Sequence, residues 1–220
     1  MYRMVVNELA GPQALTREEG PEPKPGAGEV LIEVRAVGCN FFDTLITQGR
    51  YQVRPELPFA PGAELAGLVK ALGKGVEDLS LGDRVSALLP YGAYASHVLA
   101  PRARVFPMHD RMSFEEAAAM GLVYQTSHVA LAHRAELRAG ETLLVHAAAG
   151  GVGLAAVQIG LALGARVIGT AGTEEKLALV KENGADFVLN YRDTDWVEQV
   201  KALTNGRGAD VIYDPVGGDY

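Results

Sequence analysis

The chain has 220 residues and a formal net charge of −7, and this charge argues against nucleic acid or an anionic membrane surface as its main partner. Its hydrophobic content of 48% is typical of a globular protein, and its length suffices for two domains. The single cysteine, Cys39, excludes an internal disulfide and a four-cysteine zinc site. We therefore expect a cytoplasmic protein that has no secretory signal and no transmembrane segment.

The first half of the chain carries strand patterns that are separated by glycine and proline. Glu29–Val37 alternates apolar and polar residues with a period of two, which predicts a half-buried strand. Further strands are expected within Gly62–Leu72, after Gly82, and over Ala93–Leu99. Together these segments predict a compact β-barrel type of domain with little helix.

A capping-box pattern marks the end of this β-rich part. Ser113, followed three residues later by Glu116, predicts the start of a helix. We expect this helix to belong to a connecting segment, Ser113–Leu131. The chain is therefore divided into a first domain of residues 1–112 and a second domain of residues 113–220.

The most informative stretch is a glycine-rich turn after a short apolar strand, Leu143–Val145. Ala148-x-Gly150-x-x-Gly153 fits the G-x-G-x-x-G fingerprint with alanine in place of the first glycine. Gly150 would let the backbone approach phosphates, and Gly153 would let the next helix pack close to the sheet. Backbone N–H groups and the positive end of the helix dipole would then bind a pyrophosphate. Tight turns need glycine for steric reasons as well, but the repeats that follow favour a dinucleotide site.

Strands and single helices alternate after this turn, which implies right-handed crossovers and a doubly wound parallel sheet. Four strands are expected, whereas a complete dinucleotide-binding domain usually has six. We therefore expect a truncated sheet and a fragment of a longer protein. The expected elements after the first strand are a strand at Ala165–Thr170, a helix from the N-cap Thr173 to Gly184, a strand at Asp186–Asn190, a helix at Asp195–Leu203 and a strand at Ala209–Asp214.

Several motifs follow one another in a fixed order: Gly38–Asp43 (GCNFFD), Pro61–Glu64 (PGAE), Gly82–Val85 (GDRV), the turn at 146–153, and Asn190–Arg192 (NYR). With these motifs the chain resembles the medium-chain dehydrogenase/reductase superfamily, and most of all its zinc-independent quinone oxidoreductases. The resemblance implies an α/β protein in which a GroES-like catalytic domain precedes a Rossmann domain. It also implies a family chain longer than this one.

The resemblance separates this chain from the zinc-dependent alcohol dehydrogenases. Those enzymes carry a cysteine where this chain has Asn40 and a histidine where it has Ala63. Glu64 remains, but one carboxylate does not hold a catalytic zinc, which needs about three protein ligands. We therefore expect hydride chemistry without a metal, and we interpret Cys39 as a buried structural cysteine.

The expected cofactor is NADPH rather than NADH. NAD sites place an acidic residue about 20 residues after the glycine turn, whereas this chain has the neutral run Thr170–Thr173 there. Such a pocket leaves room for a 2′-phosphate, and the resemblance implies that Lys176 and Tyr191 contact it. A solvated helix lysine and a core tyrosine at a strand end are the alternatives.

The resemblance also places Thr126 near the nicotinamide, with ordinary helix packing as the alternative. The full set of residues expected to bind the cofactor is Thr126, Ala149, Gly150, Gly151, Val152, Gly153, Thr170, Lys176 and Tyr191.

The reaction requires a donor to the oxyanion that forms on the substrate oxygen, and a neutral amide or hydroxyl suffices. The resemblance implies that Asn40 and Tyr51 line the substrate pocket, with Tyr51 as proton donor or orienting hydroxyl. Asp43 would accept a hydrogen bond behind Asn40. A capping Asn40, a surface-loop Tyr51 and a helix N-terminal Asp43 are the alternatives. For His146, which precedes the glycine turn, we expect a structural role.

These features predict an enzyme that transfers a hydride from NADPH to a quinone or another α,β-unsaturated carbonyl. Alkenal and enoyl-thioester reduction make the same electronic demand and stay open. A protein that binds NADPH without turnover is the hypothesis from a different class. We expect a small-molecule substrate, no nucleic-acid or membrane partner, and a homodimer if the full-length chain is present.

Overall fold

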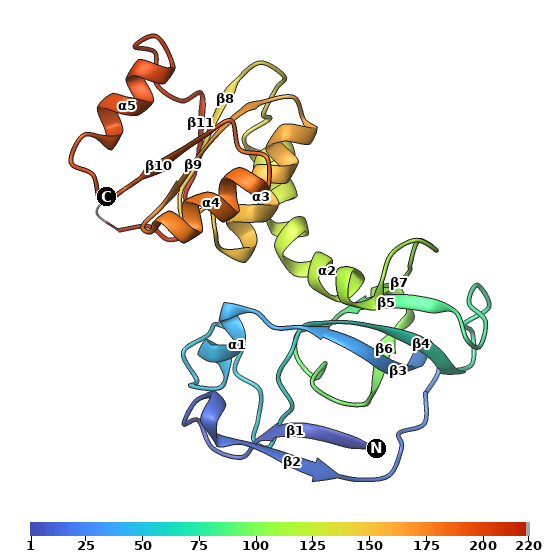
Figure 1. The fold of residues 1–220 in the computed structure, drawn as a ribbon. Coiled ribbons are helices and arrows are strands. Elements are labelled where there is room, and N and C mark those ends of the chain that lie inside the picture. Colours follow the sequence, from blue (N-terminus) through green and yellow to red (C-terminus); the bar gives the residue numbers. More distant parts are fainter. Residues whose placement is uncertain (219–220) are drawn as a thin grey trace. The chain divides into compact units, whose positions relative to one another are not determined.

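The computed structural model describes residues 1–218, and its contacts divide the chain into two compact units, Met1–Leu122 and Val123–Tyr220 (Figure 1). The division lies inside helix α2 (Phe114–His128), beyond the boundary expected after residue 112. The first turns of α2 belong with the first unit because Ala117 and Ala118 share a buried cluster with Ala66.

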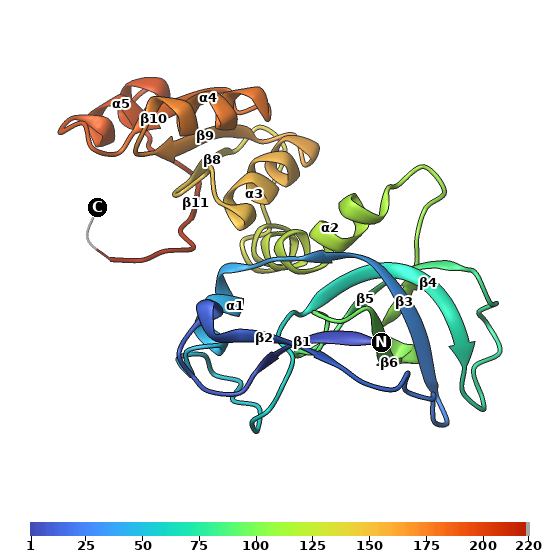
Figure 2. The same ribbon diagram turned by 60° about the horizontal axis from the view of Figure 1, so that its bottom comes forward.

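An antiparallel sheet of five strands forms the core of the first unit. Its strands are β3 (Glu29–Gly38), β4 (Glu64–Leu72), β5 (Arg84–Leu88), β6 (His97–Pro101) and β7 (Val105–Pro107), in the order β6-β3-β4-β5-β7. Strands β3 and β4 are long and curved (Figure 2), and the register of their pairing shifts between Leu31 and Ile32 and again after Val34. Val30 and Ile32 enter one buried cluster, but Leu31 between them is also buried, so the strand is not half-buried at this place as the period of two predicts.

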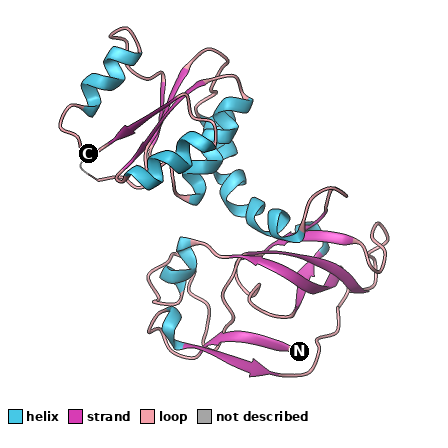
Figure 3. Ribbon diagram, in the orientation of Figure 1, coloured by secondary structure: helices cyan, strands magenta, loops and turns pink. Residues whose placement is uncertain are grey.

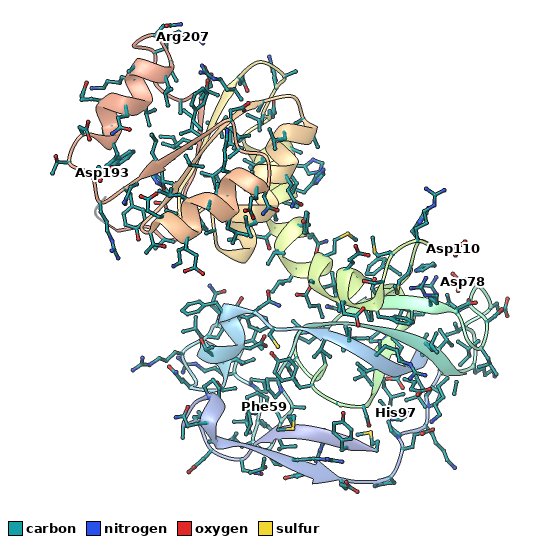
Figure 4. All side chains as sticks on the ribbon, in the orientation of Figure 1. Phe59, Asp78, His97, Asp110, Asp193 and Arg207 are labelled. Atoms are coloured by element: carbon teal, nitrogen blue, oxygen red, sulfur yellow. The ribbon has the colours of Figure 1, made fainter. Side chains whose placement is uncertain are left out.

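The N-terminal part of the first unit contains a hairpin that the sequence patterns did not predict, formed by the antiparallel strands β1 (Tyr2–Val6) and β2 (Leu15–Glu19). The short helix α1 (Phe41–Ile46) begins after Asn40, so the alternatives of a capping Asn40 and a helix N-terminal Asp43 are confirmed. Val6, Ile46 and Phe59 form one buried cluster, and Phe59 is labelled in Figure 4. The hairpin is therefore stabilised by residues that are distant in sequence, which local periodicity does not reveal.

The prediction of a strand over Ala93–Leu99 is wrong for its first half, because β6 begins only at His97. The segment before β6 is a loop that is hydrogen-bonded to the loop at Pro61 and Gly62. Ala93 donates its N–H to the Gly62 carbonyl at 3.0 Å, and Tyr94 donates to the Pro61 carbonyl at 2.9 Å. This attachment brings Tyr94 beside the motif that begins at Pro61.

The second unit contains a parallel sheet of four strands in the order β10-β9-β8-β11. Figure 3 shows the strands in magenta and the helices in cyan. Apolar residues of β8 alternate between its faces: Leu143 and Val145 join one buried cluster, and Leu144 joins another. The order places the later strand β11 on the other side of β8 from β9, so the strand order reverses at β8 while all strands stay parallel, as in a doubly wound fold. The α/β fold class and the count of four strands are confirmed within residues 1–218. The elements are β8 (Thr142–Val145), α3 (Gly151–Ala162), β9 (Arg166–Ala171), α4 (Glu174–Glu182), β10 (Phe187–Asn190), α5 (Trp196–Leu203) and β11 (Val211–Tyr213).

The ends of α4 follow the expected signals. The Thr173 side chain accepts a hydrogen bond from the Lys176 N–H, and Gly184 adopts a φ of 102° just after the helix. A π-helical segment, Val129–Arg134, extends α2. Within the described part of the chain, no helix is both long and apolar enough to cross a membrane.

Gly67 allows the close pairing of β3 and β4. A Cβ atom at this position would lie 2.2 Å from the Glu33 carbonyl oxygen. We predict that Gly67→Ala lowers the free energy of unfolding by about 1–3 kcal/mol, because the strands must separate to admit the methyl group. Urea denaturation measures this loss. Gly20→Ala is the matched control, since nothing lies within 4 Å of its added Cβ; equal effects of the two variants would contradict the packing argument.

Candidate active site

The glycine-rich turn connects β8 to α3 with the geometry that the fingerprint requires. Ala147 has a positive φ of 48°, and the Ala148 N–H donates to the Thr170 carbonyl at 2.9 Å. Gly150 is the N-cap of α3. A Cβ at Gly153 would lie 2.4 Å from the Ala147 carbonyl oxygen, so the helix approaches the turn only because residue 153 is glycine. The N–H groups of the first helical turn have no acceptor within their helix and are available to an anion.

A cavity of about 180 Å³ opens beside this turn, at the carboxyl ends of the strands. Four of the residues expected to bind the cofactor meet there: Ala149, Gly150, Lys176 and Tyr191. The remaining lining residues are Ala147, Ala171 and Gly172.

The end of this cavity at Gly172 has little space and lies near side chains that can donate hydrogen bonds. Gly172 lies between β9 and α4, and a Cβ there would be 2.5 Å from the Tyr191 hydroxyl and 3.2 Å from Arg192 Nε. Lys176 is exposed on the first turns of α4. Arg192 was not among the expected site residues, although it follows Tyr191 directly in the NYR motif. Lys176 and Tyr191 therefore line the cavity, and the Arg192 side chain lies close to Gly172 without lining it.

The other expected cofactor residues have different surroundings. Thr170 is fully buried, and its hydroxyl lies 3.0 Å from His146 Nδ1, so its side chain supports the turn from within. Gly151 and Val152 lie in the first turn of α3, where the Val152 carbonyl accepts a bond from the Ser127 hydroxyl. Thr126 is exposed on α2.

His146 lies inside the second unit. It is 5% exposed, and its ring packs edge-on against Trp196 with centroids 5.4 Å apart. Burial lowers the pKa of His146, and the charge of Asp214 opposes this only in part. A neutral, buried imidazole that contacts Thr170 agrees with the expected structural role.

A second group of polar residues forms a hydrogen-bonded network in the first unit. Asn40 is the N-cap of α1, and its Nδ2 donates to Glu64 Oε1 at 2.7 Å. Asp43 Oδ2 accepts bonds from the Asn40 N–H at 2.8 Å and from the Tyr94 hydroxyl at 3.0 Å. Its other oxygen accepts the Gly62 N–H at 3.1 Å. Asn40 is therefore held through its backbone by one carboxylate and through its side chain by another.

Both carboxylates are buried, with exposed fractions of 6% for Asp43 and 2% for Glu64. Burial raises the pKa of each, although the hydrogen bonds they accept oppose that shift. Burial also raises the pKa of Tyr94, as do its neighbours Cys39 and Asp43. Because donors surround both oxygens of Asp43, this side chain supports Asn40 from behind and α1 at its start. Tyr94 was missed by the sequence analysis, since its contact with Asp43 joins residues 51 positions apart.

Tyr51 lies in the loop after α1. Its ring packs against Phe42, with centroids 5.2 Å apart, and it borders the buried cluster of Val6, Ile46 and Phe59. It is partly buried and is not a free surface-loop side chain.

The expectation of a buried Cys39 is wrong, because the residue is exposed. Strand β3 ends at Gly38, and Cys39 lies in the short link to α1, outside the core. It borders a cavity together with Tyr94.

The residues at the zinc-ligand positions do not fit a catalytic zinc. The Asn40 amide is directed to Glu64, and Ala63 is a buried apolar residue. No group of three or more His, Cys, Asp or Glu side chains is arranged to hold a metal ion within residues 1–218. A catalytic zinc needs about three such ligands.

Two family models match the chain: an alcohol dehydrogenase GroES-like domain over residues 26–110 and a zinc-binding dehydrogenase domain over residues 151–220. The quinone oxidoreductase of Homo sapiens is 40% identical over 216 residues, which cover 97% of this chain and 66% of that protein. A synaptic vesicle membrane protein VAT-1 homolog of Rattus norvegicus is 43% identical over 197 residues, covering 89% of this chain and 48% of that protein.

Among solved structures, the quinone oxidoreductase of Escherichia coli complexed with NADPH matches with a TM-score of 0.93 and 40% identity. The match covers 100% of this chain and 67% of that chain. The chain thus spans about two thirds (66%) of the length of the human quinone oxidoreductase.

The buried His146 predicts a dependence of stability on pH. Its pKa is lowered in the folded chain, so below about pH 6.5 the unfolded chain binds more protons than the folded one. The contribution to stability is present above that pH and is lost as the pH falls through the lowered pKa. We predict that His146→Gln flattens the fall in melting temperature between about pH 7.5 and 5. His133→Gln, at an exposed position, is the control and should leave the fall unchanged; a His146→Gln profile parallel to the wild-type one would refute the prediction.

Proposed function

This chain belongs to the medium-chain dehydrogenase/reductase superfamily, in its quinone oxidoreductase-like branch, and on that premise we propose that it transfers a hydride from NADPH to a quinone or another α,β-unsaturated carbonyl. The observation that carries the proposal is the turn cavity itself, which Lys176 and Tyr191 line together with Gly172, and near which Arg192 lies beside Gly172. Within residues 1–218, no acidic side chain lines this cavity.

The surroundings of Gly172 favour NADPH over NADH. An NAD site needs a carboxylate for the ribose 2′-hydroxyl, whereas a nearby arginine accommodates a 2′-phosphate. A phosphate monoester carries close to two negative charges, and Lys176 and Arg192 would supply two positive ones. The Tyr191 hydroxyl would add a hydrogen bond. The E. coli quinone oxidoreductase with a similar fold is complexed with NADPH, which supports the same choice.

The two ends of the cofactor would be held by different parts of the chain. The first turn of α3, with Gly151, Val152 and Gly153, would direct its N–H groups at the pyrophosphate. We propose Thr126 as a residue near the nicotinamide. When bound, NADPH supplies the hydride, and this chemistry belongs to the cofactor.

The protein's own contribution to the reaction is the stabilisation of the substrate oxygen. We propose that the Asn40 amide and the Tyr51 hydroxyl donate hydrogen bonds to that oxygen as negative charge develops on it. Tyr51 would then deliver a proton or orient the carbonyl, because it is the hydroxyl group of the pair. Asp43 would position Asn40 rather than touch the substrate, since its oxygens accept bonds from Asn40, Gly62 and Tyr94.

A protein that binds NADPH without turnover is the second candidate. The similarity to a VAT-1 homolog supports it, because that protein is named for a vesicle membrane and not for a reaction. An alkenal or enoyl-thioester reductase is the alternative within the enzyme class. A cytoplasmic location and a homodimer of the full-length protein are further parts of the proposal.

The deciding experiment is a titration of the purified chain with NADPH and with NADH, followed by fluorescence, and then the addition of 1,4-benzoquinone. Binding followed by loss of the NADPH absorbance at steady state supports the reductase. Binding without oxidation by quinones, alkenals or enoyl thioesters supports the non-catalytic candidate.

The cofactor assignment predicts a selective effect of Lys176→Ala. Loss of one charged hydrogen bond to a phosphate should weaken NADPH binding by about 10- to 100-fold, while NADH binding stays unchanged. Fluorescence titration of both cofactors measures this split. Lys201→Ala removes a lysine that pairs with Glu198 on α5 and serves as the control; an equal loss of NADH affinity in Lys176→Ala would exclude a 2′-phosphate contact.

The substrate assignment predicts that Tyr51→Phe lowers turnover far more than it lowers cofactor affinity. Removal of a positioned hydroxyl that donates to the reacting oxygen should reduce kcat by about 100-fold. The ring packing against Phe42 is kept, so the melting temperature should change little. Tyr91→Phe, which alters an exposed tyrosine of the first unit, is the control. An unchanged kcat would leave Tyr51 as pocket lining only.

A further inference from the structure

A buried carboxylate joins Asn40 to the middle of helix α2. Glu64 lies at the start of β4 and is 2% exposed. Its Oε1 accepts the Asn40 Nδ2–H at 2.7 Å, and its Oε2 accepts the Leu122 N–H at 2.7 Å. The Gly121 N–H also faces the carboxylate. Each oxygen is therefore directed at a donor from a different element.

Two glycines make room for this carboxylate. A Cβ at Gly38 would lie 2.2 Å from Glu64 Oε1, and a Cβ at Gly121 would lie 3.2 Å from Oε2. Any larger residue at Gly38 would also meet the Ala118 carbonyl of α2 at 2.6 Å. The end of β3, the start of β4 and α2 thus approach one another closely around Glu64, and the carboxylate has little freedom to turn.

We propose that Glu64 is a positioning residue that determines which end of the Asn40 amide faces the substrate, an inference that rests on the proposed function. A carboxylate offers only acceptors to an amide, so the nitrogen of Asn40 must turn toward Glu64. The carbonyl oxygen and the second N–H of Asn40 are then held in one orientation. The capping box at the start of α1 acts on the other end of the same amide, because the Asp43 N–H faces the Asn40 side chain and needs an acceptor there.

Replacement of Glu64 by glutamine tests this directly, because it changes donors and acceptors without changing shape. The Leu122 and Gly121 N–H groups need an acceptor, so the oxygen of the introduced amide must face α2. The nitrogen of that amide then faces Asn40, which must turn its own oxygen inward to accept. Glu64→Gln is therefore expected to invert the Asn40 amide, at the cost of the capping-box bond from the Asp43 N–H.

The measurement is the steady-state kinetics of the 220-residue chain with NADPH and 1,4-benzoquinone, together with its NADPH affinity and melting temperature. In Glu64→Gln we expect kcat to fall by about 10- to 100-fold, while NADPH affinity stays within about twofold of wild type. Glu33→Gln, which removes a partly exposed carboxylate from β3, is the control and should keep the wild-type kcat. An unchanged kcat in Glu64→Gln overturns the proposal, and so does a fall in kcat that only follows loss of folded protein.

A second pair of variants tests the contact without using activity. Asn40→Asp places two carboxylates against each other and should lower the melting temperature. In the double variant Asn40→Asp/Glu64→Gln the introduced amide nitrogen donates to the introduced carboxylate, so the melting temperature should recover. No recovery overturns the proposed pairing. A wild-type chain that binds NADPH but oxidises none of it with any substrate overturns the proposed function instead, while recovery in this pair would still support the contact.

Discussion

The second unit depends on how closely its helices approach its sheet. The contact of α3 with the turn after β8 is tightest at Gly153, where a Cβ atom would lie 2.4 Å from the Ala147 carbonyl oxygen. Gly160 extends the close packing of α3 on the sheet, since a Cβ there would lie 2.6 Å from Leu143. Gly169 in β9 likewise lets Val180 of α4 pack close to the sheet. Because the helices lie this close, the N-terminus of α3 reaches the carboxyl edge of β8. The cavity beside the turn follows from that packing.

The first unit contains two buried carboxylates, Asp43 and Glu64. An isolated buried carboxylate is costly unless hydrogen bonds compensate it. Within residues 1–218, Asp43 and Glu64 are compensated by neutral donors, namely backbone N–H groups, an amide and a hydroxyl. Burial nevertheless raises the pKa of both. Both carboxylates accept a hydrogen bond from Asn40. The donors that compensate their burial therefore include the residue that is proposed to face the substrate.

Local patterns predicted the βα half of the chain well. The N-cap Thr173, the glycine after α4 and the four parallel strands all follow from signals that act within one turn or one strand. The β1–β2 hairpin was missed, because its stability comes from the contact of Val6 with Ile46 and Phe59. Cys39 was misjudged for a related reason: its residue type favours burial, but it lies where the chain leaves β3.

The sequence by itself determined the family, the order of the two units and the site of the glycine-rich turn, since these depend on motifs of neighbouring residues. It also determined that the zinc-ligand positions hold Asn40 and Ala63. Only the tertiary structure decided that Tyr94 supports Asp43, that Arg192 lies beside Gly172, and that Glu64 joins Asn40 to α2. These contacts connect residues far apart in the chain, and their geometry depends on how closely strands and helices pack. No local period or spacing in the sequence specifies the distance between packed elements.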